Sequence, residues 1–250
     1  MSLSPILNQT EGYNVSDKYQ VIPSIDIIQE FSRYGFEIAS VEAAGVRSLE
    51  KALKQRHMVR LKREEKMFNG EIQPEVIIYN SYDGTKALEI HIAFTRFVCA
   101  NGLIVGTHEF EPLKIHHTTI EWQDKVHEYI DTYGEKIERQ KEIYSAMKDI
   151  PMSLDEAYAY AEKAIELRHS DNRISMDVVD PLELLVARRK EDRGDRVWNR
   201  FQTIQEATIN GLFHKYSNDG SIKKAKMLTD INEIVRANKE LSNLFEKRVA

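Results

Sequence analysis

Basic residues gather in one short stretch of the chain, between residues 45 and 66. The stretch holds eight Lys and Arg residues against three Glu residues, a net charge of +5 inside a chain of 250 residues whose formal charge is −5. Phosphate binding needs several cations on a rigid surface, because each neutralised phosphate releases counterions. Lys and Arg also protect the edges of sheets. The stretch therefore predicts either a polyanion-binding surface or a solvated strand edge.

Aromatic and polar residues further along complete the predicted nucleic-acid site. Tyr79 and Tyr82 are expected to stack on unpaired bases. Arg96 interrupts an apolar run, so we expect it either to pair with a carboxylate or to face an anion. Asn101 is expected to shape the groove, or to form a turn with the next glycine. The predicted phosphate ligands are Arg47, Lys51, Lys54, Arg56, Arg60, Lys62 and Arg63.

A metal-dependent nuclease can also be built from the sequence. Hard metal ions bind paired carboxylates, and Asp83, Glu89 and His91 are the candidate ligands. Their spacing does not favour this site, since no Lys follows two residues after the acid and a turn already explains Asp83. The chain has no GxxxxGK[ST], GxGxxG or GxSxG, which disfavours the usual ATP-driven and serine-hydrolase enzymes. We expect no metal, no cofactor and no catalysis.

Composition limits the class of protein. Hydrophobic residues make up 42% and charged residues 30%, which is typical of a globular chain. The single cysteine, Cys99, excludes an intramolecular disulfide and suits a reducing compartment. The sequence has no apolar run near the roughly 18 residues of a membrane span and no signal-peptide pattern at its start. These features predict a soluble cytosolic protein without a membrane partner.

Strand signals dominate before Thr119. Period-two patterns and β-branched runs predict strands over residues 36–46, 57–63, 75–82 and 85–98. The last two flank Asp83-Gly84, a dipeptide typical of hairpins whose two turn positions need a positive φ. A short helix is predicted from Pro23, with Gly35 at its end.

Helical signals dominate after Thr119. Apolar residues from Val126 to Met147 recur every three or four positions, a seam of about three heptads that suits a core or an oligomer interface. Further helices are predicted to start at Ser153, Asp180 and Asp195, and a last one over residues 221–247. We therefore predict an α+β protein with a flexible arm (1–19), an antiparallel sheet domain (20–118) and a helical region (119–250) packed on the sheet or on a neighbouring subunit.

Several segments resemble a family of phage- and plasmid-like proteins that contain a domain of unknown function. The resemblance rests on residues 19–23, on the Arg-x-x-Cys-x-Asn-Gly pattern from Arg96 to Gly102, and on Trp198 to Phe201, and it covers about residues 19–245. Ala100 stands where such proteins often carry Thr, so this position lacks the hydroxyl that they have. The resemblance implies carriage by phages, prophages or plasmids.

A more distant similarity is to single-strand annealing proteins of the Rad, Erf and Red-beta types. It implies a curved antiparallel sheet with a backing helix, assembly into rings or filaments, and a basic groove that holds single strands without ATP. The leading hypothesis is therefore a phage or mobile-element protein that binds single-stranded DNA as a homo-oligomer and promotes annealing.

Two alternatives stay open. Residues 121–169 contain 12 acidic and seven basic side chains, so this half of the chain could instead contact a host protein, for example by inhibiting a defence enzyme. The metal-dependent nuclease is the second alternative.

Overall fold

The computed structural model describes residues 4–43, 45, 48–64, 67, 71–96, 111–169, 178–229 and 231–249. The described residues up to 137 form one compact unit, and those from 138 onward form a second. The helix α4 (Tyr133–Asp149) crosses this division. Within the described part of the chain, no helix is long and apolar enough to cross a membrane.

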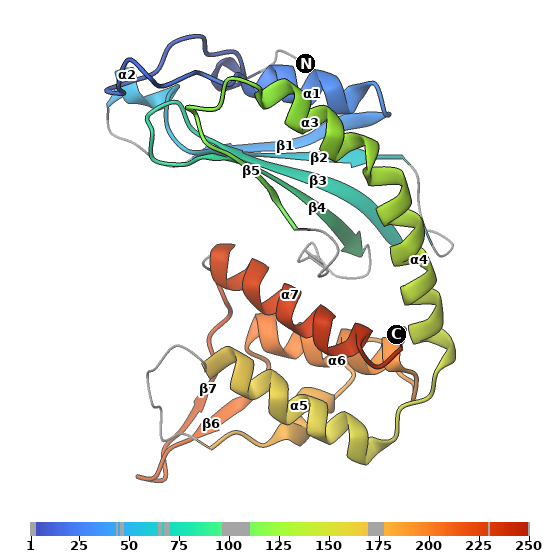
Figure 1. Cartoon of the computed structure of the whole chain (residues 1–250). Coiled ribbons are helices and arrows are strands. Elements are labelled where there is room, and N and C mark those ends of the chain that lie inside the picture. Colours follow the sequence, from blue (N-terminus) through green and yellow to red (C-terminus); the bar gives the residue numbers. More distant parts are fainter. Residues whose placement is uncertain are drawn as a thin grey trace. The chain divides into compact units, whose positions relative to one another are not determined.

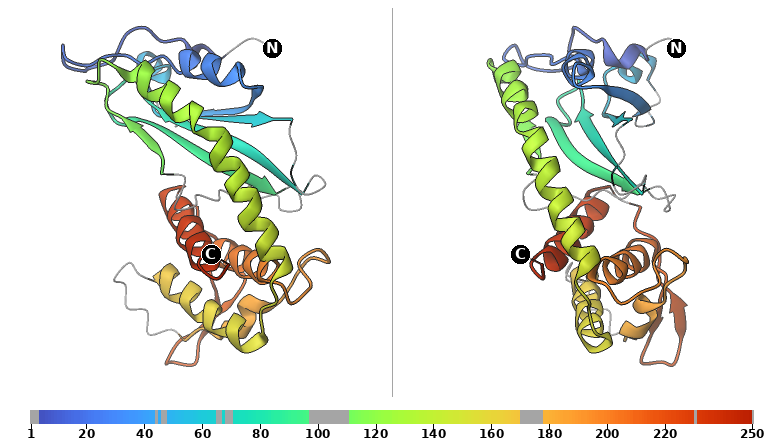
Figure 2. Two further views of the ribbon diagram at one scale, coloured as in Figure 1. Left: turned by 45° about the vertical axis from the view of Figure 1, so that its right-hand side comes forward. Right: turned by 90° about the vertical axis from the view of Figure 1, so that its right-hand side faces the viewer.

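The first unit is built on a five-stranded antiparallel sheet with the strands in chain order. This architecture, followed by a mostly helical second half, confirms the predicted α+β class. Figure 1 shows α1 and α3 along one face of the sheet, and Figure 2 shows the same layer in two further views. The elements are η1 (Pro5–Leu7), α1 (Ser24–Ser32), β1 (Phe36–Ala43), α2 (Leu49–Ala52), β2 (His57–Arg63), β3 (Ile72–Asn80), β4 (Leu88–Arg96), β5 (Leu113–Ile115) and α3 (Trp122–Asp131).

The sheet packs its apolar side against these helices. Val59, Ile78 and Ile90 are cross-strand partners on β2, β3 and β4, and each is fully buried. Successive strand residues point to opposite faces, so the apolar positions of each strand meet on one side. Phe36 extends the core toward the helices through an edge-on ring contact of 5.7 Å with Phe31.

The hairpin around Asp83-Gly84 is confirmed, but its predicted two-residue turn is wrong. Strand β3 ends at Asn80 and β4 begins at Leu88, so the connection is a longer loop. Only Gly84 of the pair has a positive φ, at 71°. The Asp83 carboxylate instead accepts a hydrogen bond of 3.2 Å from the Thr85 N–H, and this side-chain turn replaces the tight backbone turn.

Residues 4–19, for which the sequence predicts a flexible arm, pack against the first unit. Ile6 and Leu7 are buried. The Tyr13 N–H donates to the Tyr82 carbonyl over 2.8 Å, and the Tyr19 hydroxyl donates to the Ser81 carbonyl over 2.8 Å.

The second unit is helical with one small ribbon of two strands. Its aromatic core lies around α6, where Phe201 contacts Phe245 at 5.2 Å between ring centroids and Trp198 contacts Tyr144 at 5.0 Å. Figure 1 shows the pair of strands β6 and β7 extending from the helices. Besides the end of α4, the elements are α5 (Leu154–His169), η2 (Pro181–Leu185), α6 (Val197–Asn210), β6 (His214–Tyr216), β7 (Ile222–Lys224) and α7 (Ile231–Glu246).

Local helix signals were confirmed more often than helix lengths. Ser153 accepts a hydrogen bond of 3.1 Å from the Glu156 N–H, as the predicted cap requires. Asp180 caps a 3-10 helix rather than an α-helix. The predicted seam from Val126 to Met147 is divided between α3 and α4 at Thr132. The last predicted helix starts too early, because residues 222–224 form a strand and α7 begins at Ile231.

Candidate nucleic-acid interface

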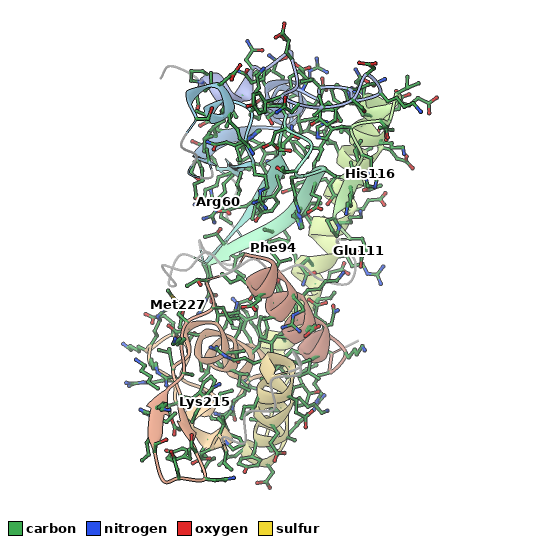
Figure 3. All side chains as sticks on the ribbon, turned by 90° about the vertical axis from the view of Figure 1, so that its left-hand side faces the viewer. Arg60, Phe94, Glu111, His116, Lys215 and Met227 are labelled. Carbon is green, nitrogen blue, oxygen red and sulfur yellow. The ribbon has the colours of Figure 1, made fainter. Side chains whose placement is uncertain are left out.

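The sheet face opposite α1 and α3 carries most of its charged side chains; we call it the polar face. Its residues follow from the strand register: Glu37, Lys62, Glu75 and Ala93 form one cross-strand row, Ser40, Arg60, Ile77 and His91 the next, and Glu42, Met58, Tyr79, Glu89 and Lys114 a third. Cross-strand partners share a face, so the register brings side chains from all five strands together, including the exposed carboxylates of Glu37 and Glu42 on β1. Figure 3 shows Arg60 beside the strands.

Glu75 organises the first charged group on this face. Its Oε2 accepts hydrogen bonds from Arg60 Nε at 3.1 Å and from the same guanidinium's Nη2 at 2.6 Å. Lys62 Nζ lies 3.0 Å from the other carboxylate oxygen. The Glu75 side chain is 1% exposed, whereas Arg60 and Lys62 are 26% and 34% exposed. The carboxylate is therefore buried, and the two cations form the outer layer of a group with a net charge of +1.

Glu89 organises a second charged group. Lys86 Nζ donates to its Oε2 over 2.7 Å, and His91 Nε2 and Lys114 Nζ lie 3.6 and 3.7 Å from its carboxylate oxygens. The neighbouring His91, followed by Lys86, lowers the pKa of Glu89 to about 2 despite partial burial, which raises it. Glu89 is thus a firmly ionised carboxylate that holds cations in place.

Tyr79 belongs to the same row as Glu89 and is half-buried. Its ring meets His91 edge-on, with 5.3 Å between centroids, and Lys86 Nζ lies 5.7 Å from the ring centre. The hydroxyl is buried with no hydrogen-bond partner among the described residues, and burial raises its pKa. The structure therefore joins Tyr79, Arg60 and Lys62 of the predicted site on one face.

Other predicted phosphate ligands lie elsewhere. Lys51 Nζ is 3.3 Å from an Asp83 carboxylate oxygen, and Lys54 Nζ donates to the Glu11 carbonyl over 2.6 Å. Arg56 is exposed in the segment before β2. Arg63 directly follows Lys62 on β2, so its side chain lies on the opposite, helix-covered face of the sheet, where its cross-strand partner is Phe36. These cations do not line one trough with Arg60.

Two further predicted contacts are buried, which corrects their assigned roles. Tyr82 has no exposed surface, and its hydroxyl donates to Ser24 Oγ over 3.2 Å, so its ring cannot stack on a base. Arg96 is 1% exposed, and its Nε donates to Glu71 over 2.9 Å. Of the two predicted alternatives, a carboxylate partner or an anion, the structure shows the carboxylate partner. Arg47 and Asn101, like Cys99, lie outside the described residues.

The candidate nuclease ligands do not converge. Glu89 and His91 are neighbours on the polar face, whereas Asp83 is in the loop before β4, bonded to Thr85 and close to Lys51. Among the residues that the structure describes, no group of three or more His, Cys, Asp and Glu side chains could hold a metal ion.

The acidic half presents its charges to solvent. Of the 12 acidic residues from Glu121 to Glu166, all but Glu156 are exposed, and Glu156 is half-buried against Arg248. This distribution suits a solvated surface as well as a contact with a basic partner.

Sequence reasoning missed a basic ribbon in the second unit. Residues 214–226, the β6–β7 ribbon, contain four lysines against one aspartate, a net charge of +3. Figure 3 shows Lys215 on this ribbon. Asp219-Gly220 between His214–Tyr216 and Ile222–Lys224 is a hairpin signal of the same kind as Asp83-Gly84, and it could have found the ribbon.

The chain is similar to proteins of one family. The family described as "Domain of unknown function (DUF932)" matches residues 13–232. The UPF0380 proteins YfjQ and YafZ of Escherichia coli (strain K12) are each 28% identical over 239 residues, which is 94% of this chain and 84% of each relative. No solved structure gives a significant match.

Proposed function

We propose that this chain, which belongs to the DUF932 family, binds single-stranded DNA on the polar face of its N-terminal sheet. The observation that carries the proposal is the group around Glu75, in which two partly exposed cations lie outside one buried carboxylate. A phosphate that approaches this group meets the two cations outside the buried Glu75, next to the exposed Glu37 that is the cross-strand partner of Lys62 on β1.

The carboxylate does not cancel this attraction. Arg60 uses Nε and Nη2 on Glu75, and a guanidinium has five N–H donors, so further donors stay available to a phosphate. The ion pairs also fix two long side chains that would otherwise lose rotamer freedom on binding. Glu75 thus lowers the net charge of the group but positions its cations.

The second group and Tyr79 extend the site along the strands. Glu75 and Tyr79 are four residues apart on β3, which is about 13 Å in an extended strand. Tyr79 and the cations around Glu89 lie at that end. A single strand can place phosphates on both groups and stack a base on Tyr79, whereas a duplex keeps the faces of its bases covered. The geometry therefore supports unpaired DNA over duplex on this face.

The distant similarity to single-strand annealing proteins extends the proposal. Annealing is downhill once the repulsion between two strands is screened, so it needs no ATP, and the sequence has no phosphate-binding loop of the GxxxxGK[ST] type. We include annealing by a homo-oligomer, and a role in a phage or mobile element, as parts of this proposal.

The test compares oligonucleotide binding by two variants that lower the net charge equally. The triple variant Arg60→Gln/Lys62→Gln/Glu75→Gln removes the first group without leaving a buried charge, and Lys125→Gln on α3 is its control because Lys125 is exposed. Fluorescence anisotropy with a labelled single strand is measured over a range of salt. We expect the triple variant to reduce the slope of log affinity against log salt by about 1.4, from two lost contacts.

Equal binding by the triple variant and the control would refute the site. Absence of binding by the wild-type protein at low salt would refute the function. Cleavage of the strand in the presence of magnesium or manganese would favour the nuclease alternative instead.

A further inference from the structure

We infer that the β6–β7 ribbon of the second unit is a separate nucleic-acid site that inserts into a groove of double-stranded DNA. The proposal goes beyond the single-strand site, because it concerns another unit, other residues and another form of DNA. Its starting point is a difference in how the two units hold their cations.

Among the described residues, the ribbon's lysines have no carboxylate partners. Lys215, Lys223, Lys224 and Lys226 form no ion pair there, and Asp219 at the turn interacts electrostatically with Lys223. Lys223, Lys224 and Lys226 are exposed and Lys215 is half-exposed. Unlike Arg60 and Lys62, these ammonium groups have no fixed counter-charge in the part of the chain that the structure describes.

The strand register places two like charges opposite each other. Lys215 pairs with Lys223 on one face of the ribbon, and Lys224 lies on the other face opposite His214, whose ring contacts the Glu183 carboxylate. Directly opposed like charges destabilise a strand pair. Both strands of a two-stranded sheet are edge strands, so lysines on β6 and on β7 also protect an edge. Edge protection does not require them to face each other, whereas an anion that binds the ribbon would offset the repulsion of the opposed pair.

The base of the ribbon is held in place by the rest of the unit. Glu183 on η2 accepts hydrogen bonds from the His214 N–H and the Tyr216 hydroxyl, both over 2.8 Å. The Val178 and Tyr216 backbones exchange two hydrogen bonds of 2.8 Å. Gly211, at the end of α6, lies so close that an added Cβ would be 2.6 Å from the carbonyls of Ala225 and Lys226.

The tip of the ribbon is also ordered by local bonds. The Ser217 N–H donates to the Ser221 carbonyl over 3.0 Å, and Asp219 accepts from the Ser221 N–H over 2.9 Å. Gly220 at the turn has a positive φ of 80°. An added Cβ there would have no heavy atom within 4 Å, so the tip is open to solvent. A rigid base and an ordered tip reduce the entropy lost on binding.

This shape fits a groove better than a single strand. A major groove about 12 Å wide admits a two-stranded ribbon, and its two walls are both lined by phosphates. Cations on both faces of the ribbon can contact both walls at once, whereas a single strand would use one face only. The exposed apolar row Val178, Tyr216 and Ile222, which are cross-strand neighbours, offers apolar contacts of the kind that base edges and thymine methyl groups accept.

The experiment uses the full chain and a DNA duplex of about 20 base pairs. Lys223→Glu/Lys224→Glu reverses two ribbon charges, and Lys125→Glu/Lys247→Glu makes the same change in net charge at exposed sites outside the ribbon. We expect the ribbon variant to weaken duplex binding by about tenfold or more, and Lys223→Gln/Lys224→Gln to reduce the salt slope by about 1.8. Single-strand binding should change little.

Four outcomes would overturn the inference, of which the first two are no duplex binding at roughly 50 mM salt and equal duplex binding by the ribbon variant and the control. The third is an equal affinity for an RNA duplex, whose deep major groove does not admit side chains. The fourth is that Ile222→Glu changes the oligomer mass while the duplex affinity stays constant. The last would assign the apolar row to self-association. Loss of duplex binding with intact single-strand binding separates this inference from the proposed function, because the reverse pattern is expected for the Glu75 group.

Discussion

Replacing Arg60 by Gln should destabilise the first unit chiefly through the charge that it leaves behind on Glu75. The carboxylate is 1% exposed and loses two hydrogen bonds from the guanidinium. Breaking a buried pair costs about 3–5 kcal/mol. Lys62 stays 3.0 Å from the carboxylate and Arg60 is 26% exposed, so we expect a smaller loss of about 2 kcal/mol. The double variant Arg60→Gln/Glu75→Gln has no buried charge and should lose about 1 kcal/mol or less.

The assay is urea unfolding followed by tryptophan fluorescence. The chain has two tryptophans, Trp122 in the first unit and Trp198 in the second, and two units need not unfold in one step. In a Trp198→Phe background, Trp122 alone reports the first unit. A complete double-mutant cycle with Glu75→Gln should give a coupling of about 1–2 kcal/mol. If the two single substitutions are additive within about 0.5 kcal/mol, Arg60 and Glu75 do not act as a unit and the argument for a positioned cation pair fails.

Three further predictions concern Glu89, His57 and Gly211. The pKa of Glu89 is lowered to about 2, so its contribution to stability is complete above its ordinary pKa of 4.5 and is lost as the pH falls toward 2. Between about pH 5 and pH 2.5, the urea midpoint of Glu89→Gln should therefore fall less than that of the wild-type protein. Equal falls would contradict this. Burial lowers the pKa of His57 below 6.5, so stability should decrease as the pH drops below that value, and His57→Gln should flatten the unfolding profile between pH 7 and 5. Gly211→Ala should lower the free energy of unfolding more than Gly220→Ala, because Gly211 has no room for a Cβ. Gly220→Ala carries only the backbone penalty of about 1–2 kcal/mol. Equal losses of unfolding free energy, measured through Trp198, would disprove the close approach at Gly211.

Features that depend on neighbours in sequence were predictable. Alternating residues in 57–63 gave the bounds of β2, and Gly35, which has a φ of 81°, follows the end of α1. Ser153 caps α5 through a bond that spans three residues. Each of these signals is produced by sterics and hydrogen bonds within one turn or one strand, so a short window contains its cause.

The rest depends on contacts that a short window does not contain. Tyr82 follows a strand like an exposed loop residue, yet Ser24, 58 residues away, receives its hydroxyl in the core. The β6–β7 ribbon has strands of only three residues, too short to show an alternation, so the Asp219-Gly220 turn signal stands without the strand pattern that would support it. The apolar pattern continues across Thr132 because α3 and α4 both bury residues at the same helical spacing. The pattern therefore does not reveal that one helix ends and the next begins at this residue.

A charge count over a short stretch of sequence also misses partners that folding brings in. The two basic regions are therefore compared by their charges in the folded chain. Arg60 and Lys62 lie in a window of net charge +5, but their partner Glu75 is 15 residues from Arg60 and arrives by strand pairing. The folded group carries +1. The ribbon carries +3 by sequence; folding brings the Glu183 carboxylate to His214 and Tyr216 at its base, but its lysines form no ion pairs with described residues. Screening weakens exposed, unpaired charges more than buried pairs. Added salt should therefore reduce duplex binding at the ribbon more steeply than single-strand binding at the Glu75 group, where a buried carboxylate fixes the cations.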